Sequence, residues 1–265
     1  MRGSSLLRAT FVHLPGIGPT TEVELWRRGV TDWRELRELA ATRDAPARIH
    51  PGLDHALAAS ETALAGREVG WFARRFPERE LWRLYPAFRE RTAFLDIETT
   101  SLSPYEGIVT VVTVHGGGAT RSFIAGESLE ELPAYLRGFG LLVTFNGSRF
   151  DVPFLETAFA QFQAPPVHID LRFLLYRLGH AGGLKRIEAR LGLGDRTGVE
   201  GIDGLQAVRL WQEYRRGSPE ALDRLVRYNR ADTKNLEPLL ELAVRELADR
   251  LPLPAAPARS PGRSP

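Results

Sequence analysis

The 265-residue sequence contains no cysteine. Disulfide bonds, thiolate metal sites and cysteine nucleophiles are therefore excluded, and any bound metal must be held by oxygen or imidazole ligands. Long apolar runs are also missing, because none approaches the roughly 20 residues that a helix needs to cross a bilayer. The N-terminus shows no basic start followed by an apolar core and a small-residue cleavage site, so the sequence predicts a cytoplasmic protein.

Lysine is scarce, since Lys185 and Lys234 are the only two among 35 lysines and arginines. Arginine binds phosphate through two parallel hydrogen bonds, which would suit a nucleic-acid partner. A genome with biased base composition explains the excess of arginine better, and a net charge of +2 does not by itself indicate nucleic-acid binding. The 43% of hydrophobic residues are enough for one large domain, or for one medium and one small domain.

The first 90 residues are predicted to form a small, mainly helical region. Within residues 13–30, a tight Gly-Ile-Gly turn opens a helix that Gly29 ends. This segment resembles the helix-hairpin-helix motif, whose glycines let the backbone approach a phosphate and whose helix start offers free N–H groups. The alternative is that the turn only packs one helical hairpin on another. The nucleic-acid contacts that the resemblance implies are at Gly16, Ile17, Gly18 and Thr20.

Aromatic residues are interleaved with arginines between residues 53 and 90. Such a mixture could stack bases and pair with phosphates. We favour a second interpretation, in which this helical segment buries its rings against the main domain while the arginines stay in solvent. The rings are those of Trp71, Phe72, Phe76, Trp82, Tyr85 and Phe88.

From residue 92 the pattern changes to strands. Three strands come first, with a run of three glycines as the turn between the second and the third. A helix over residues 128–137, two further strands and several helices follow. This order resembles that of a ribonuclease-H-like domain, which implies an α/β fold with a mixed β-sheet flanked by helices on both faces. The predicted strands cover residues 93–98, 108–115, 119–124, 141–145 and 167–171.

These patterns divide the chain into three parts. The helical region covers residues 1–90, and the ribonuclease-H-like domain covers residues 91–250. Residues 251–265 hold five prolines and no periodicity, which predicts a disordered, proline-rich tail.

Two acids, Asp96 and Glu98, stand at the end of the first predicted strand with one apolar residue between them. Because side chains alternate faces along a strand, both carboxylates point the same way. Two carboxylates on one face repel each other and are costly to bury unless a cation neutralises them. Hard divalent cations such as Mg²⁺ or Mn²⁺ suit carboxylate oxygens, whereas a solvated strand end is the plainer alternative.

Further acids follow in two later blocks. Asp151 stands at a predicted helix start, where an acid also suits the helix dipole without any other role. Tyr228 and Asp232 are four residues apart, which places them on one face of a helix. An amphipathic helix with a half-buried tyrosine and an exposed acid would give the same spacing. Pro238 is predicted to bend or break that helix.

Taken together and in this order, D-x-E, N-x-x-x-F-D and Y-x-x-x-D resemble the three motifs of the DEDDy branch of the DnaQ-like 3′–5′ exonucleases. Within that superfamily, residues 92–250 are most similar to the YprB-like proteins. Three residues separate Asn146 from Phe150, a spacing closer to the proofreading domains of family-B polymerases than to the bacterial proofreading subunits.

The resemblance implies a site for two divalent metal ions, Mg²⁺ or Mn²⁺. It implies that Tyr228 orients the attacking water and that four acids both bind the metals and act in catalysis. Asp170, at another strand end, is a weaker candidate that could face the same cleft without being a ligand. The four acids are Asp96, Glu98, Asp151 and Asp232.

The implied activity is 3′–5′ exonucleolytic hydrolysis of phosphodiester bonds by a two-metal-ion mechanism, releasing nucleoside 5′-monophosphates. Single strands or 3′ ends of nucleic acid would be the substrate, with DNA favoured because a helix-hairpin-helix more often accompanies DNA enzymes. Two alternatives remain open. One is a 3′–5′ exoribonuclease that trims RNA, and the other is a non-catalytic nucleic-acid-binding module on the same fold.

Overall fold

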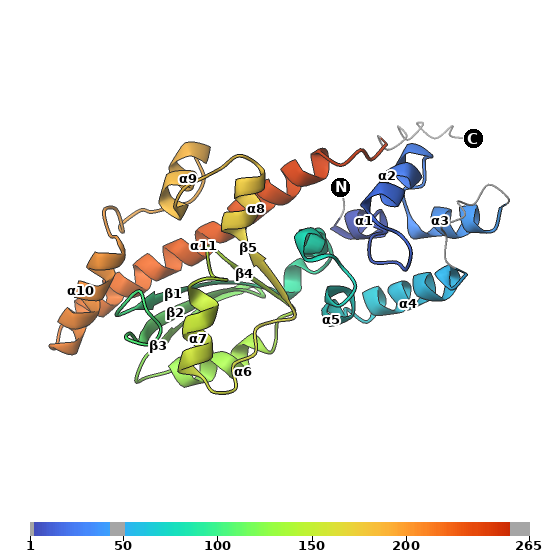
Figure 1. Ribbon diagram of the computed structural model, residues 1–265. Helices are drawn as coiled ribbons and strands as arrows, with labels where there is room; N and C mark the ends of the chain where they lie inside the picture. The colour runs from blue at the N-terminus through green and yellow to red at the C-terminus, as the bar shows by residue number, and fades with distance from the viewer. Residues whose placement is uncertain (1–2, 43–50, 255–265) are drawn as a thin grey trace, which may run out of the picture.

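The computed structural model describes residues 3–42 and 51–254, with side chains from residue 6 onward. It shows a five-stranded mixed sheet flanked by helices and preceded by a helical N-terminal region (Figure 1), as the sequence predicts. Most of the predicted disordered tail, from residue 255 onward, lies outside the described residues.

The sheet has the strand order β3-β2-β1-β4-β5. The central strand β1 pairs antiparallel with β2, where Leu95 faces Val114, and parallel with β4, where Phe94 faces Val143. Every predicted strand is present to within about one residue at each end. The strands are β1 Thr92–Thr99, β2 Val109–Gly116, β3 Ala119–Ile124, β4 Leu141–Thr144 and β5 Val167–Asp170.

The β2–β3 hairpin depends on its glycines. Gly117 and Gly118 have φ angles of 58° and 82°, the left-handed values that glycine adopts without strain. A Cβ atom on Gly116 would lie 2.1 Å from the carbonyl oxygen of Thr92 on the neighbouring strand. The glycine run therefore serves both the turn and the close approach of β1.

The two faces of β1 pack against different helices. Leu95 and Ile97 belong to a core with α6 Leu132–Leu136 and α7 Asp151–Ala158. Phe94 packs instead in the core that contains the C-terminal half of α11 Pro219–Asp249, which crosses the opposite face of the sheet (Figure 1). Since Asp96 and Glu98 alternate with Leu95 and Ile97, they point toward the α11 face.

Shorter helices complete the sheet domain. The predicted helix over residues 128–137 is a 3₁₀ turn, η3 Leu129–Glu131, that runs directly into α6. Three helices link β5 to α11. They are α8 Leu171–Arg177, α9 Leu184–Leu191 and α10 Gly204–Arg215.

The long helix α11 differs from the prediction at Pro238, where it continues without a break. The predicted break is wrong because tertiary packing holds the turns on both sides of the proline, where Leu236, Leu239 and Leu240 are fully buried. Packing of this kind offsets the one hydrogen bond that proline cannot donate. Among the residues that the structure describes, no helix is both long and apolar enough to span a membrane.

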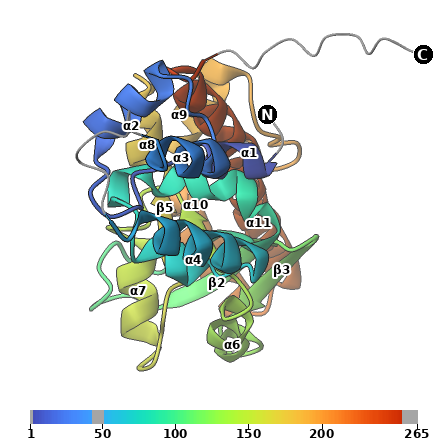
Figure 2. The ribbon, with the colours of Figure 1, turned by 90° about the vertical axis from the view of Figure 1, so that its right-hand side faces the viewer.

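The N-terminal region is helical, as predicted, and its last segment contacts β5 of the sheet domain. Figure 2 looks onto the N-terminal helices, with the sheet domain behind them. One apolar core runs through both parts, because Trp82 and Leu84 belong to the same cluster as Phe94, Val143 and Ile169. The elements of this region are α1 Gly3–Arg8, α2 Pro19–Arg27, α3 Trp33–Ala40, α4 Leu53–Ala65, α5 Val69–Ala73, η1 Glu78–Ala87 and η2 Arg89–Arg91.

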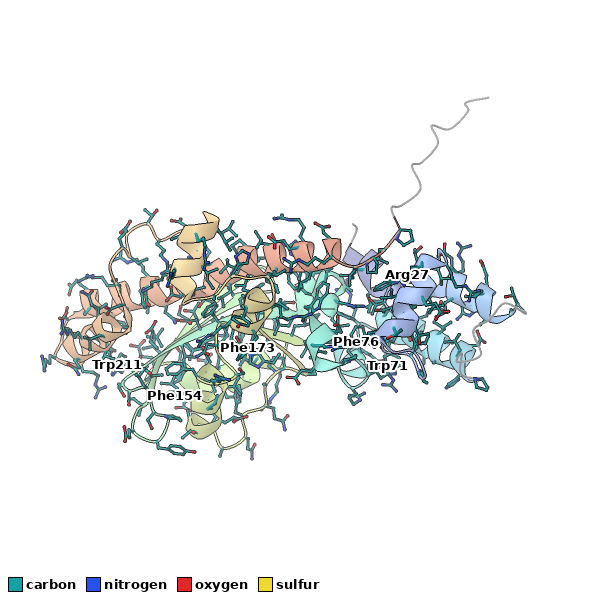
Figure 3. All side chains as sticks on the ribbon, turned by 45° about the horizontal axis from the view of Figure 1, so that its top comes forward. Arg27, Trp71, Phe76, Phe154, Phe173 and Trp211 are labelled. Carbon is teal, nitrogen blue, oxygen red and sulfur yellow. The ribbon has the colours of Figure 1, made fainter. Side chains whose placement is uncertain are left out.

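The aromatic rings between residues 53 and 90 are packed in the interior rather than exposed to solvent. Figure 3 labels Trp71 and Phe76 in this region, away from Phe154 and Trp211 of the sheet domain. Trp71 is half-buried, with the guanidinium of Arg75 3.9 Å from the centre of its ring, and the other five rings are buried. Burial of the rings is therefore confirmed, whereas the expectation that the arginines stay in solvent is wrong for Arg83, which is buried and paired with two acids.

A buried ion network joins α2 to η1. The Glu22 carboxylate accepts hydrogen bonds from the N–H groups of Phe11 and Val12, at 2.6 and 3.2 Å. Its second oxygen lies 2.7 Å from Nη1 of Arg83, whose Nε lies 2.8 Å from Glu80. Burial raises the pKa of Glu22, and the Arg83 charge opposes that rise. The network fixes the helical hairpin to the segment that leads into β1.

Candidate active site

Three carboxylates meet between β1 and α11. One oxygen from each of Asp96, Glu98 and Asp232 can be chosen so that all three lie within 4.8 Å of one another. Glu98 and Asp232 are buried, and Asp96 is partly exposed. The two acids that strand alternation places on one face of β1 therefore meet the acid of α11 in one cluster.

Asp151 lies beside this cluster, in the first turn of α7. The pairing of β1 with β4 ends at Phe94, which leaves the following edge of β1 free. The backbone of Ile97 on that edge lowers the pKa of the buried Asp151 carboxylate, which places the two groups close together. Asp151 thus reaches the edge of the strand that carries Asp96 and Glu98.

The clustered charges raise one another's pKa values. The pKa of Asp96 is well above its usual range because of burial and, next, the charges of Asp232, Asp151 and Glu98. Burial and Asp232 do the same to Glu98. Without a compensating cation, these acids therefore favour their protonated forms.

Tyr228 lies one helical turn before Asp232 on α11 and is buried. Burial raises the pKa of its hydroxyl, and the charges of the nearby carboxylates, first that of Asp232, raise it further. The side chain is therefore a neutral hydrogen-bond donor at physiological pH, not a base.

Asn229, which sequence analysis missed, is fully buried next to Tyr228. Its Nδ2 donates to Oδ2 of Asp96 at 2.8 Å, and its side chain also lowers the pKa of Glu98. Asn229 thus favours the ionised form of both carboxylates and fixes the orientation of Asp96. Asn229 is neutral, so a pattern of charged residues in the sequence does not include it.

Two cations reach the same region from the segment before α10. Nη1 of Arg196 lies 2.6 Å from Oδ1 of Asp232. Nζ of Lys185 lies 4.5 Å from the centre of the Tyr228 ring, and its charge lowers the pKa of Glu98. Neither residue forms a local pattern with the acids, so only the folded chain brings them together.

Asp170 does not join the cluster. Its carboxylate accepts hydrogen bonds from the backbone N–H groups of Asn146, Ser148 and Arg172, at 2.8, 3.1 and 3.1 Å, and from the Ser148 hydroxyl at 2.6 Å. It therefore caps α8 and holds the loop that precedes Asp151. In that loop a Cβ atom on Gly147 would lie 2.2 Å from Oγ1 of Thr144, so the loop lies directly on the end of β4.

The hairpin residues of the N-terminal region are not part of the acidic cluster. Gly16, Gly18 and Thr20 are exposed around the start of α2. Ile17 is buried, and its N–H donates to the carbonyl of Leu14 at 3.2 Å. That N–H is therefore already engaged within the turn.

The residues present fit a divalent cation. Mg²⁺ and Mn²⁺ take oxygen ligands, and two oxygens on one Mg²⁺ ion lie at most about 4.2 Å apart. The three oxygens that lie within 4.8 Å approach that spacing, so small side-chain movements would suffice. A dication would also offset the mutual repulsion that raises the pKa values of Asp96 and Glu98.

In the absence of metal, we expect Asp151→Asn to stabilise the protein increasingly as the pH rises from 4 to 7. Burial raises the pKa of Asp151 to about 7, so the folded state keeps a proton that the unfolded state has lost. Its contribution to stability is complete below about pH 4 and is lost as the pH rises through 7.

The measurement is urea unfolding of both proteins in chelator between pH 4 and 8. The difference between variant and wild type isolates Asp151 from groups with the opposite trend, such as His13, whose pKa burial lowers to about 3. A difference in unfolding free energy that is the same at pH 4 and pH 8 would contradict the prediction.

Comparisons with known proteins agree with this fold. A sequence model of the RNase_H superfamily matches residues 93–244, more than half of the chain. The family B DNA polymerase from the hyperthermophilic archaeon Pyrobaculum calidifontis is similar at 18% identity and a TM-score of 0.50. That match covers 61% of this chain but 25% of the polymerase, so the chain spans a quarter of the polymerase's length and the likeness shows the fold.

A second group of solved structures is less similar in shape. Brucella melitensis NrnC matches at 21% identity and a TM-score of 0.43, over 62% of this chain and 78% of that one. The same protein with bound Mg²⁺ matches over 65% and 92%, with a TM-score of 0.33. No curated protein matches the sequence.

Proposed function

Because the chain belongs to the ribonuclease H superfamily, we propose that it is a metal-dependent 3′–5′ exonuclease of the DEDDy type. The observation that carries this proposal is the meeting of Asp96, Glu98 and Asp232 within 4.8 Å, beside Asp151 and the hydroxyl of Tyr228. Superfamily membership alone does not establish an activity, whereas this set of groups is suited to phosphodiester hydrolysis.

The acids, Tyr228 and Asn229 have different roles in the proposed reaction. The four acids would hold two divalent ions, Mg²⁺ or Mn²⁺, which when bound supply charge stabilisation and an activated water. Tyr228, as a neutral donor, would orient the attacking water, and Asn229 would keep Asp96 in place. The acids are Asp96, Glu98, Asp151 and Asp232.

The proposed substrate is a single strand or the 3′ end of a nucleic acid, with DNA favoured over RNA. The products would be nucleoside 5′-monophosphates. Support for DNA comes only from the helix-hairpin-helix-like segment in the N-terminal region, so the sugar preference is decided by assaying both substrates.

The test is hydrolysis of 5′-labelled DNA and RNA oligonucleotides with Mg²⁺ or Mn²⁺. We expect a ladder that shortens from the 3′ end, is lost with chelator, and shows which sugar is preferred. Internal cleavage would replace the exonuclease by an endonuclease. No cleavage of either substrate with either metal would favour a non-catalytic binding module on the same fold.

We also propose that the hairpin binds the phosphate backbone of the substrate at Gly16, Gly18 and Thr20. These exposed residues surround the N-terminal end of α2, where backbone N–H groups and the helix dipole favour an anion. Ile17 would serve by packing, because its N–H already bonds Leu14.

Gly18→Asp should weaken DNA binding without harming the fold. Gly18 has extended backbone angles, and a Cβ atom there would meet nothing within 4 Å. Aspartate is a favourable N-cap, so stability should be unchanged or slightly higher, while its charge repels phosphate. We expect about tenfold weaker binding at low salt and a shallower salt dependence.

Binding is measured with an inactive Asp96→Asn background to prevent hydrolysis. Gly18→Asn is the matched control, because it has the same shape and capping ability without the charge. Equal DNA affinity of Gly18→Asp and Gly18→Asn would mean that the hairpin has only a packing role.

A further inference from the structure

One arginine side chain bridges two acids at the edge of the carboxylate cluster. Arg196 lies between α9 and α10, and its Nε is 2.5 Å from Oε2 of the buried Glu188. On the other side, its Nη1 is 2.6 Å from Oδ1 of Asp232. The Arg196 side chain is only 20% exposed, so the contact with Asp232 is largely enclosed.

The chain before Arg196 is held in place by α11. Asn235, three residues after Asp232, accepts from the N–H of Asp195 at 2.9 Å and donates back to its carbonyl at 3.3 Å. Gly194 has a φ of +90°, and a Cβ atom there would lie 2.7 Å from Nδ2 of Asn235. The segment therefore follows α11 so closely that Arg196 is directed at Asp232.

The guanidinium is permanently charged and lies on a carboxylate that the proposed function assigns to a metal ion. In the metal-free protein it neutralises Asp232 and so relieves repulsion among the acids. When a divalent cation approaches, the same charge competes for Asp232 and repels the ion.

We propose that Arg196 is an internal counter-ion of Asp232 that lowers the affinity of the site for divalent metal. The inference rests on the proposed metal site, and it adds a residue that controls how readily that site fills. Arg196 is thus a positioning residue rather than a catalytic one.

The experiment is titration of the full-length protein with Mn²⁺ alone, with free Mn²⁺ followed by electron paramagnetic resonance. Arg196→Gln should bind Mn²⁺ about tenfold more tightly than wild type, because a unit charge next to the ion is removed. Arg209→Gln, which removes the same charge from an exposed position of α10, should bind as wild type does.

Unchanged or weaker Mn²⁺ binding by folded Arg196→Gln would overturn the inference. If wild type still hydrolyses oligonucleotides in an Asp96-dependent way, the proposed function survives that result. Absence of Mn²⁺ binding in both proteins would overturn the inference and the proposed metal site together.

A second variant covers the case in which Arg196→Gln does not fold. Asn235→Ala keeps the guanidinium but removes the two hydrogen bonds that direct its segment toward α11. Mn²⁺ binding tighter than wild type would then support the inference, and binding equal to or weaker than wild type would overturn it.

Discussion

Replacing Asp96 with asparagine should abolish hydrolysis of oligonucleotides while stabilising the metal-free protein. The acid lies at the centre of the cluster, and the charges of Asp232, Asp151 and Glu98 all act on it. Removing one metal ligand should lower the rate by about 10³-fold or more, equivalent to roughly 4 kcal/mol. Removing one of several repelling charges should raise the free energy of unfolding at pH 7 by about 1 kcal/mol or more.

The opposite signs of these effects distinguish a functional site from a structural one. Replacing an acid that has only a structural role would destabilise the protein. In Asp96→Asn, by contrast, the new side-chain oxygen can still accept the hydrogen bond from Asn229. Asp223→Asn, the same change at an exposed position of α11, should alter neither quantity. Near-normal hydrolysis by purified Asp96→Asn would refute the assignment of the site.

The second large effect concerns stability and lies in the N-terminal region. Replacing Arg83 with methionine should lower the free energy of unfolding by about 3–5 kcal/mol, because it leaves the buried Glu22 carboxylate without its cation. Glu80 loses the same partner. Urea unfolding of variant and wild type at pH 7 measures the difference.

Two further variants isolate the cause. Arg79→Met removes an exposed arginine from the same η1 segment and should cost less than about 1 kcal/mol. Glu22→Gln combined with Arg83→Met should be more stable than Arg83→Met alone, since the amide oxygen can still accept from Phe11 and Val12 without a buried charge. A double variant no more stable than Arg83→Met would mean that the lost packing of the arginine side chain dominates.

Local sequence determined the elements of the fold and the direction of several side chains. Strand alternation placed Asp96 and Glu98 on one face, and the four-residue spacing placed Tyr228 and Asp232 on one side of a helix. These features follow from the repeat of a single strand or helix, which neighbouring residues dictate. The individual strands and the helical N-terminal region were predictable for the same reason, whereas the mixed pairing of the sheet was expected from the order of its elements.

Tertiary structure alone decided what surrounds those side chains. Glu22 meets Arg83 across 61 residues, and Asn229 meets Asp96 across 133. Contacts at such separations depend on which segments the topology brings together, and no local repeat records them. The continuation of α11 through Pro238 has the same origin, because packing on both sides of the proline outweighed its local preference. The contact between Arg196 and Asp232 is also tertiary, because it exists only where the segment after α9 folds back along α11.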